Sequence, residues 1–204
     1  MSAPRVGVLA LQGAFREHIE ILRGLGVDAF PLRTAGELDD ADAVVLPGGE
    51  STTMDKLLRK FALQQPLRER LSDGLPALAT CAGLILLSRE VLDGLPDQQS
   101  LGLLPIATRR NGYGRQPESF EREVTVRGLD APFPGVFIRA PVIESMDGDV
   151  EVLADLEGRP VAIAFGAVMG LTFHPELTGD GRLHQLFLER SRQPRRQPAE
   201  TARA

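Results

Sequence analysis

Short apolar runs alternate with amphipathic segments through the first half of the chain, and this alternation restricts the possible folds most strongly. The apolar runs have the length of buried strands and span residues 6–11, 27–32, 43–46 and 76–79. Apolar side chains recur at helical spacing between them, in residues 14–25, 51–61 and 65–71. Strands that alternate with helices form a parallel sheet covered on both faces, so the sequence predicts an α/β fold.

The second half has a different pattern, in which short strand-like segments are joined by turns rich in Gly, Pro or Asp. These segments span residues 103–109, 120–126, 136–138, 150–156, 160–165 and 168–173. We expect them to extend the same sheet in antiparallel fashion, before a final helix from residue 182 to about residue 190.

The length of 204 residues fits one well-buried domain, which we place at residues 1–190. Residues 191–204 lack apolar side chains large enough to pack. They are therefore expected to be a disordered tail.

Composition argues against several classes of function. A formal net charge of -5 and a pI near 5.3 disfavour a nucleic-acid-binding protein. No apolar run approaches the roughly 20 residues of a membrane-spanning helix, and the first residues lack the layout of a signal peptide. A single cysteine permits no internal disulfide, which fits a reducing, cytoplasmic setting. The three histidines and one cysteine lack the spacing of metal ligands, so we expect no metal.

That single cysteine, Cys81, stands between small residues where a strand pattern changes to a helix pattern. An α/β enzyme presents a nucleophile at such a corner, because the sharp turn pushes the side chain out of the sheet. The N–H groups that begin the next helix can lower a thiol pKa and hold an oxyanion. A lone cysteine is more often a small buried apolar residue, so its position alone leaves both interpretations open.

A base and an orienting acid for a thiol nucleophile follow the last expected strand. His174 and Glu176 are separated by one proline and can point to the same side. One ring nitrogen of His174 would then bind Glu176 while the other faces Cys81. The same three residues can also form a plain turn. The other histidines, His18 and His184, lie on expected helices among charged residues and are predicted to be solvated at the surface.

A glycine-rich segment, residues 47–53, follows the third expected strand with the sequence Pro-Gly-Gly-Glu-Ser-Thr-Thr. Two adjacent glycines let backbone N–H groups approach a ligand closely. Glu50 would repel a phosphate but suits an ammonium group, and the Gly-Lys-Ser/Thr ending of a phosphate-binding loop is missing. The simpler interpretation is a turn into a helix that Ser51 or Thr52 caps.

Two segments that contain arginine are further candidates for ligand binding. Residues 109–116 form a polar, glycine-bearing stretch, and residues 137–141 place Arg139 at a strand end, where it can pair with a carboxylate. A solvated turn and a surface ion pair explain these segments equally well when each is considered alone.

Together these segments resemble the class I, triad-type glutamine amidotransferases, and most closely the family of glutaminase subunits of pyridoxal 5'-phosphate synthase. The resemblance runs from Val6 to about Glu189. Cysteine and His-Pro-Glu mark the broad class, whereas Gly-Gly-Glu-Ser-Thr-Thr, the stretch from Arg110 to Gln116 and Phe-Ile-Arg-Ala-Pro are specific to the family. The resemblance implies a single-domain, flavodoxin-like fold with a mixed, mainly parallel sheet.

The resemblance also implies a role for each matching position. Cys81 is the nucleophile, and His174 and Glu176 complete the triad. The remaining positions are the L-glutamine contacts Gly49, Glu50, Ser51, Arg110, Ile138 and Arg139, and the oxyanion-hole amides of Gly48, Gly49 and Ala82.

The implied reaction is hydrolysis of L-glutamine to glutamate and ammonia, without a metal or cofactor. The ammonia would pass to a (β/α)-barrel synthase subunit that builds pyridoxal 5'-phosphate, the active form of vitamin B6. No nucleic acid or membrane is expected as a partner.

Three alternatives share part of the pattern. A glutaminase that serves another synthase, such as that of imidazole glycerol phosphate, would not be expected to carry the stretch at residues 110–116. A noncatalytic binding module on the same fold has no need of an intact triad. A cysteine peptidase on a related fold is disfavoured by the match to the glutamine-binding loop.

Overall fold

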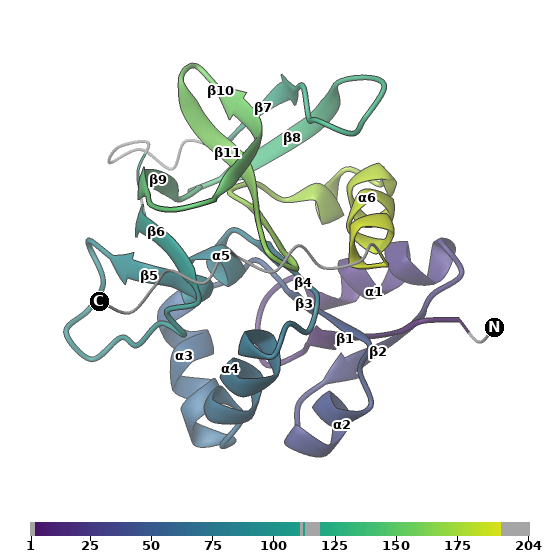
Figure 1. Ribbon diagram of the computed structural model, residues 1–204, viewed down its shortest axis with the longest axis vertical. Helices are drawn as coiled ribbons and strands as arrows, with labels where there is room; N and C mark the ends of the chain where they lie inside the picture. The colour runs from purple at the N-terminus through teal and green to yellow at the C-terminus, as the bar shows by residue number, and fades with distance from the viewer. Residues whose placement is uncertain (1–2, 111, 113–118, 193–204) are drawn as a thin grey trace.

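The computed structural model describes residues 3–110, 112 and 119–192, which fold around a central sheet (Figure 1). Within these residues the sheet has seven strands in the order β10-β11-β12-β4-β3-β1-β2. The parallel strands are β1 (Arg5–Leu9), β2 (Asp28–Leu32), β3 (Ala43–Leu46), β4 (Ala77–Thr80) and β12 (Val168–Leu171). At one edge, β10 (Glu151–Leu156) and β11 (Arg159–Phe165) pair in antiparallel fashion. The predicted mainly parallel sheet is confirmed.

Helices cover both faces of this sheet, as the alternating pattern requires. One face carries α1 (Phe15–Gly24) and α6 (Arg182–Ser191). The apolar cluster on the other face includes residues of α2 (Ala35–Asp39), α3 (Ser51–Lys60), α4 (Gln64–Ser72) and α5 (Ala82–Leu87). The helices expected from apolar spacing begin and end within a residue of their predicted limits.

Helix α2 was not predicted, because five residues are too few for a helical period to show. Its start nevertheless has a sequence signal. Thr34 accepts a hydrogen bond from the backbone N–H of Glu37, and Glu37 accepts one from the backbone N–H of Thr34. This reciprocal capping is the pattern Thr-x-x-Glu, which can be recognised in a sequence.

The prediction that all the later strands extend the main sheet is wrong. One of them, β6 (Leu104–Arg109), lies in a separate sheet with β5 (Ser88–Val91) and β9 (Val142–Met146), two strands that the sequence pattern did not predict. Another two, β7 (Ser119–Val124) and β8 (Phe133–Ile138), form an antiparallel pair. Apolar alternation indicates that a strand exists and which face it buries, but it does not indicate which distant strand becomes its partner.

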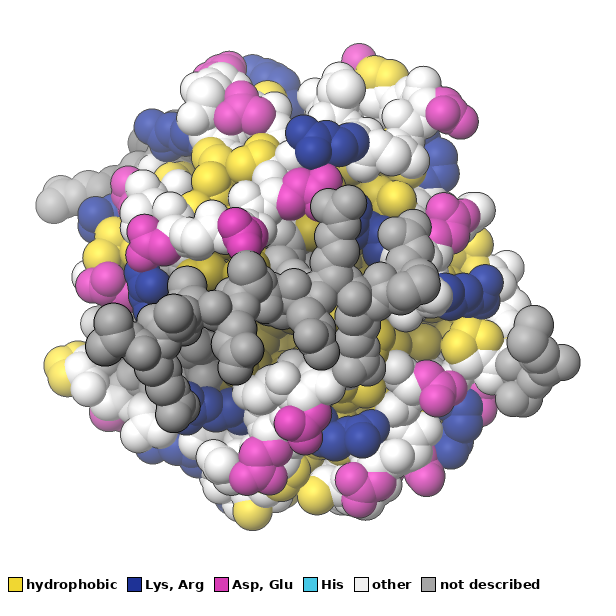
Figure 2. Space-filling model, viewed as in Figure 1, with side chains coloured by type: hydrophobic (Ala, Val, Ile, Leu, Met, Phe, Trp, Pro, Cys, Tyr) yellow, Lys and Arg dark blue, Asp and Glu magenta, His cyan; other side chains and the backbone are white. Residues whose placement is uncertain are grey.

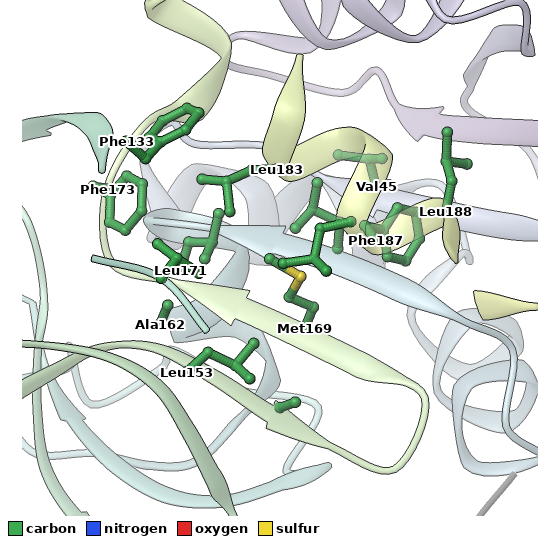
Figure 3. Packing of buried hydrophobic residues seen from close by; sticks show 14 of the residues in the cluster. Val45, Phe133, Leu153, Ala162, Met169, Leu171, Phe173, Leu183, Phe187 and Leu188 are labelled. Atoms are coloured by element: carbon green, nitrogen blue, oxygen red, sulfur yellow. The ribbon is translucent and has the colours of Figure 1, made fainter. Parts of the chain in front are cut away.

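Large apolar side chains fix α6 against the end of β12. In Figure 3 Leu183 of α6 lies on the side of Leu171 of β12, and Phe187 lies on the side of Met169; all four are buried. Phe173, two residues beyond Leu171, is also fully buried, and its ring centroid lies 6.1 Å from that of Phe133. Burial of side chains of this size contributes about 1.5–3 kcal/mol each. The segment that follows β12 therefore has a rigid support.

Positively and negatively charged side chains are intermixed on the face seen in Figure 2. Over the described residues, no helix is long and apolar enough to cross a membrane.

The carboxyl ends of the parallel strands meet at one edge of the sheet. Gln12 follows β1, Gly48 follows β3, Cys81 follows β4, and His174 follows β12. In open α/β sheets ligands bind at this edge, so the topology brings the predicted site residues together.

Gly83 of α5 provides a test of the packing between α5 and β3. A Cβ atom at this position would lie 2.1 Å from the carbonyl oxygen of Leu46, a backbone atom that cannot easily move. We expect Gly83→Ala to lower the free energy of unfolding by about 1–3 kcal/mol.

Gly36→Ala in α2 is the matched control, since a Cβ atom there would meet nothing within 4 Å. Alanine favours a helix over glycine by up to about 1 kcal/mol. Urea unfolding measures both variants, and equal stability of the two would contradict the described packing.

Candidate active site

Cys81 forms a sharp corner between β4 and α5, as the sequence predicts. Its backbone has φ of 47° and ψ of -102°, in a region that residues with a Cβ atom rarely occupy. Its N–H donates to the carbonyl of Leu171 at 2.8 Å, and its own carbonyl accepts from Ile85 N at 3.2 Å. Ala82 is the first residue of α5, so its amide lies at the positive end of that helix beside the thiol.

His174 and Glu176 lie together at the start of the short 3₁₀ helix η1 (Pro175–Leu177). Nδ1 of His174 donates to Oε1 of Glu176 at 2.7 Å, and both side chains are buried. The backbone N–H of His174 donates to the carbonyl of Val136 in β8 at 2.9 Å. His174 is therefore held by hydrogen bonds at both its ring and its backbone N–H.

The protonation of His174 is set by its two neighbours. Burial alone would lower the pKa of His174, but its interactions with Cys81 and Glu176 outweigh burial and raise the pKa to about 10. At neutral pH the ring therefore keeps its second proton. An imidazolium beside a thiol stabilises the thiolate, which is the nucleophilic form of cysteine.

The two glycines after β3 lie against these groups. A Cβ atom on Gly48 would lie 2.3 Å from Cε1 of His174, and one on Gly49 would lie 2.3 Å from Oε1 of Gln12. The carbonyl of Gly48 accepts a hydrogen bond from Ala14 N at 3.0 Å. Only glycine fits this close contact between the loop and the imidazole, and the loop is fixed by the segment that follows β1.

Glu50 is the N-cap of α3, so the prediction that Ser51 or Thr52 caps this helix is wrong. Its carboxylate accepts from Thr52 N at 3.1 Å, from Thr53 N at 2.7 Å and from the Thr53 hydroxyl at 2.7 Å. Ser51 is already helical and buried. Partial burial opposes ionisation of Glu50, but the hydrogen bonds from Thr53 and Thr52 outweigh it and lower its pKa to about 2.

A glutamine side chain that the sequence did not single out, Gln98, joins the glycine-rich loop to Arg110. Its amide nitrogen donates to Ser51 Oγ at 3.1 Å, and its oxygen accepts from Arg110 at 3.2 Å. Arg110 also donates to Glu50 at 2.8 Å. Gln98 lies in a polar connection without a motif, so no local signal marks it.

Ile138 and Arg139 lie at the end of β8, two and three residues beyond the carbonyl that binds His174 N. Arg139 has a φ of 44° and is exposed. Asn111 and residues 113–116 of the predicted binding stretch lie outside the described residues.

The prediction that His18 and His184 are solvated is wrong, since both have 0% exposure. Charged neighbours in the sequence suggested a surface position, but these neighbours lie on the opposite faces of α1 and α6. The spacing to Leu22 and Leu188, four residues on in each helix, indicates the apolar face. Nε2 of His18 lies 3.3 Å from Oε2 of Glu176.

Comparison with known proteins decides the family. The model of the SNO glutamine amidotransferase family matches residues 8–193. The chain belongs to this family. Its relatives include two proteins named pyridoxal 5'-phosphate synthase subunit PdxT. One, from Parafrankia sp., is 54% identical and covers 93% of this chain and 94% of its own length. The other, from Nocardioides sp., is 52% identical over 92% of this chain and 96% of its own length.

Solved structures agree with this assignment. A crystal structure titled as a glutamine amidotransferase has a TM-score of 0.86 at 49% identity, and covers 91% of this chain and 98% of its own. A protein from Thermoplasma acidophilum, described as part of a putative GMP synthase, has a TM-score of 0.67 at 20% identity, over 94% of this chain and 95% of its own. This second likeness shows the fold alone. The predicted class I amidotransferase fold is confirmed.

The lowered pKa of Glu50 predicts how its contribution to stability depends on pH. The folded pKa of about 2 lies below the ordinary value of 4.5, so the contribution is full above pH 4.5 and falls as the pH falls toward 2. We expect Glu50→Gln to destabilise the protein more at pH 7 than at pH 3.5. Urea unfolding at both pH values measures this, and a loss that is equal at both would contradict it.

Proposed function

We propose that this family member hydrolyses L-glutamine to glutamate and ammonia, and supplies the ammonia for synthesis of pyridoxal 5'-phosphate. The observation that carries the chemistry is a buried His174 that is hydrogen-bonded to Glu176 and lies against Gly48, with a pKa that its interaction with Cys81 helps to raise. The relatives named as subunits of pyridoxal 5'-phosphate synthase support the pathway.

The first half of the reaction forms a thioester. The Cys81 thiolate attacks the side-chain carbonyl carbon of glutamine, and the carbonyl π electrons move to oxygen. Backbone N–H groups of Ala82 and the Gly48-Gly49 loop would hold this oxyanion, each donor being worth on the order of 3 kcal/mol. The His174 imidazolium then donates its proton to the amide nitrogen, and the C–N bond breaks to release ammonia.

The second half regenerates the enzyme. His174, now neutral, takes a proton from water, and the resulting hydroxide attacks the γ-glutamyl thioester. The C–S bond breaks to give glutamate, and the thiolate and imidazolium are restored. Glu176 accepts the Nδ1 hydrogen bond throughout, so Nε2 is the nitrogen that faces the reacting atoms.

Charged groups on two sides of the site would hold the amino-acid head group of glutamine. Glu50 is ionised and suits the α-ammonium group. The guanidinium of Arg139 forms no hydrogen bond or ion pair within the described part of the chain, so it is available for the α-carboxylate. Gly49, Ser51, Arg110 and Ile138 would complete the contacts around these two groups.

The partner would be the (β/α)-barrel synthase subunit, because ammonia that diffuses away is lost to the synthesis. A cytoplasmic location fits the single cysteine, which functions as a thiol.

Cys81→Ala tests both the nucleophile and the ammonia supply. With the synthase present, we expect this variant to lose glutamine hydrolysis and glutamine-dependent formation of pyridoxal 5'-phosphate. Added ammonium salt bypasses the missing step, so it should restore product formation to the wild-type level. Product absorbance and released glutamate measure the two activities. Retained hydrolysis of free glutamine would overturn the assignment of Cys81.

Arg139→Ala tests recognition of the head group. A charge-assisted hydrogen bond is worth about 1.5–3 kcal/mol, so we expect the KM for glutamine to rise by about 10- to 100-fold. Arg127→Ala is the control, since Arg127 is an exposed arginine paired with Glu151. We expect its KM to stay at the wild-type value. An unchanged KM in Arg139→Ala would remove Arg139 from the binding site.

A further inference from the structure

A buried polar cluster lies behind the triad acid, on the side away from His174 Nδ1. It consists of His18 from α1, His184 from α6, Thr80 at the end of β4, and Glu176. The first three residues have 0% exposure and Glu176 has 4%. Polar groups buried to this degree cost free energy unless hydrogen bonds satisfy them, so their mutual contacts decide what the cluster does.

Close contacts connect these groups in one chain. Nδ1 of His18 lies 2.8 Å from Nε2 of His184. Nε2 of His18 lies 3.3 Å from both Thr80 Oγ1 and Glu176 Oε2. Within the described residues, Oε2 of Glu176 and Nδ1 of His184 have no hydrogen-bond partner. The polar nitrogen that faces the second carboxylate oxygen is therefore His18 Nε2.

Both histidines are neutral near pH 7. Burial, followed by repulsion from His184 and His174, lowers the pKa of His18 well below 6.5. Burial also lowers the pKa of His184 to about 4, although Asp180 acts weakly in the opposite direction. Each ring therefore carries one N–H, and only two arrangements of the two protons are compatible with the 2.8 Å contact between Nδ1 of His18 and Nε2 of His184.

In the first arrangement His18 carries its proton on Nε2, and His184 donates from Nε2 to His18 Nδ1. The His18 N–H then points toward Thr80 and the Glu176 carboxylate. In the second arrangement His18 donates from Nδ1 to His184, and its bare Nε2 faces a carboxylate oxygen 3.3 Å away. Two lone pairs repel each other at that distance, and the second arrangement also leaves a buried N–H on His184 without an acceptor. The first arrangement is favoured.

We propose that His18 is a positioning residue, whose Nε2–H holds the second oxygen of Glu176 while His184 fixes the tautomer of His18. The proposal rests on the proposed function, in which Glu176 orients His174. It extends the triad by two buried histidines from α1 and α6. Without His18, no polar nitrogen would lie within 3.3 Å of the second carboxylate oxygen, and the carboxylate could rotate away from the imidazole.

Two substitutions at His18 separate hydrogen bonding from packing. In His18→Gln the side-chain amide N–H lies near the position of Nε2. In His18→Asn the amide lies near the position of Nδ1, which leaves Glu176 without a donor. Removing a group that orients a site residue commonly costs about 10- to 100-fold in activity. On the same scale, we expect kcat for glutamine hydrolysis to fall by about 10- to 100-fold in His18→Asn and by less than about 3-fold in His18→Gln. KM should stay unchanged in both, because His18 lies behind the triad.

Ile19→Ala is the matched structural control. Ile19 is the adjacent buried residue of α1 and has no polar group, so its truncation weakens the same helix without touching the cluster. All variants are assayed as full chains in complex with the synthase, with urea unfolding measured in parallel. We expect Ile19→Ala to lose stability and keep the wild-type kcat.

The outcomes are distinct. A kcat near the wild-type value in His18→Gln, together with a reduced kcat in His18→Asn, supports the positioning role. Three results overturn it. They are a wild-type kcat in His18→Asn, an equal loss of kcat in His18→Gln and His18→Asn, and a loss of kcat in Ile19→Ala equal to that in His18→Asn. If wild-type protein hydrolyses no glutamine with the synthase present, the proposed function itself fails, which is a separate result.

Discussion

The hydrogen bond from Cys81 N–H to the carbonyl of Leu171 joins the ends of β4 and β12, and the geometry of the site depends on it. It holds a cysteine at positive φ, a conformation that costs on the order of 1–3 kcal/mol and persists only where the surroundings impose it. The surroundings here include Gly83, which packs directly on the carbonyl of Leu46. Because His174 follows Leu171 by three residues, this bond also joins the strand end that carries the nucleophile to the one that precedes the base.

The groups behind Cys81 differ in charge in a fixed order: His174 is cationic, Glu176 is anionic and His18 is neutral. The pKa of His174, raised to about 10, reflects a cation between the Cys81 sulfur and the Glu176 carboxylate. The next group, His18, is neutral because burial and the other histidines lower its pKa. A second cation next to Glu176 would compete with His174 for the carboxylate. A neutral N–H placed near the second carboxylate oxygen would leave that ion pair intact, so a buried neutral histidine suits this position.

The sequence could predict the parallel core and could single out Cys81, His174 and Glu176, because both depend on local patterns. Cys81 at a strand-to-helix corner and His-Pro-Glu after a strand are short signals, and the structure places them side by side. Strands β5 and β9 were not predicted at all, and the partners of β6, β7 and β8 could not be predicted, since pairing depends on contacts between segments far apart in the chain. His18 and His184 were misassigned for a related reason. Their charged neighbours in the sequence resemble those of a surface position, whereas the spacing to Leu22 and Leu188 marks the buried face, and their real partners lie on other elements.

The hydrogen bonds of Glu50 constrain how glutamine would enter. A carboxylate offers about four lone-pair sites, and Glu50 already accepts from Thr52 N, Thr53 N, the Thr53 hydroxyl and Arg110. An ammonium group that binds Glu50 therefore has to displace one donor. The Thr52 and Thr53 groups belong to the first turn of α3 and cannot leave without uncapping the helix. Arg110 belongs to a connection outside α3, so it is the donor that can leave without uncapping the helix.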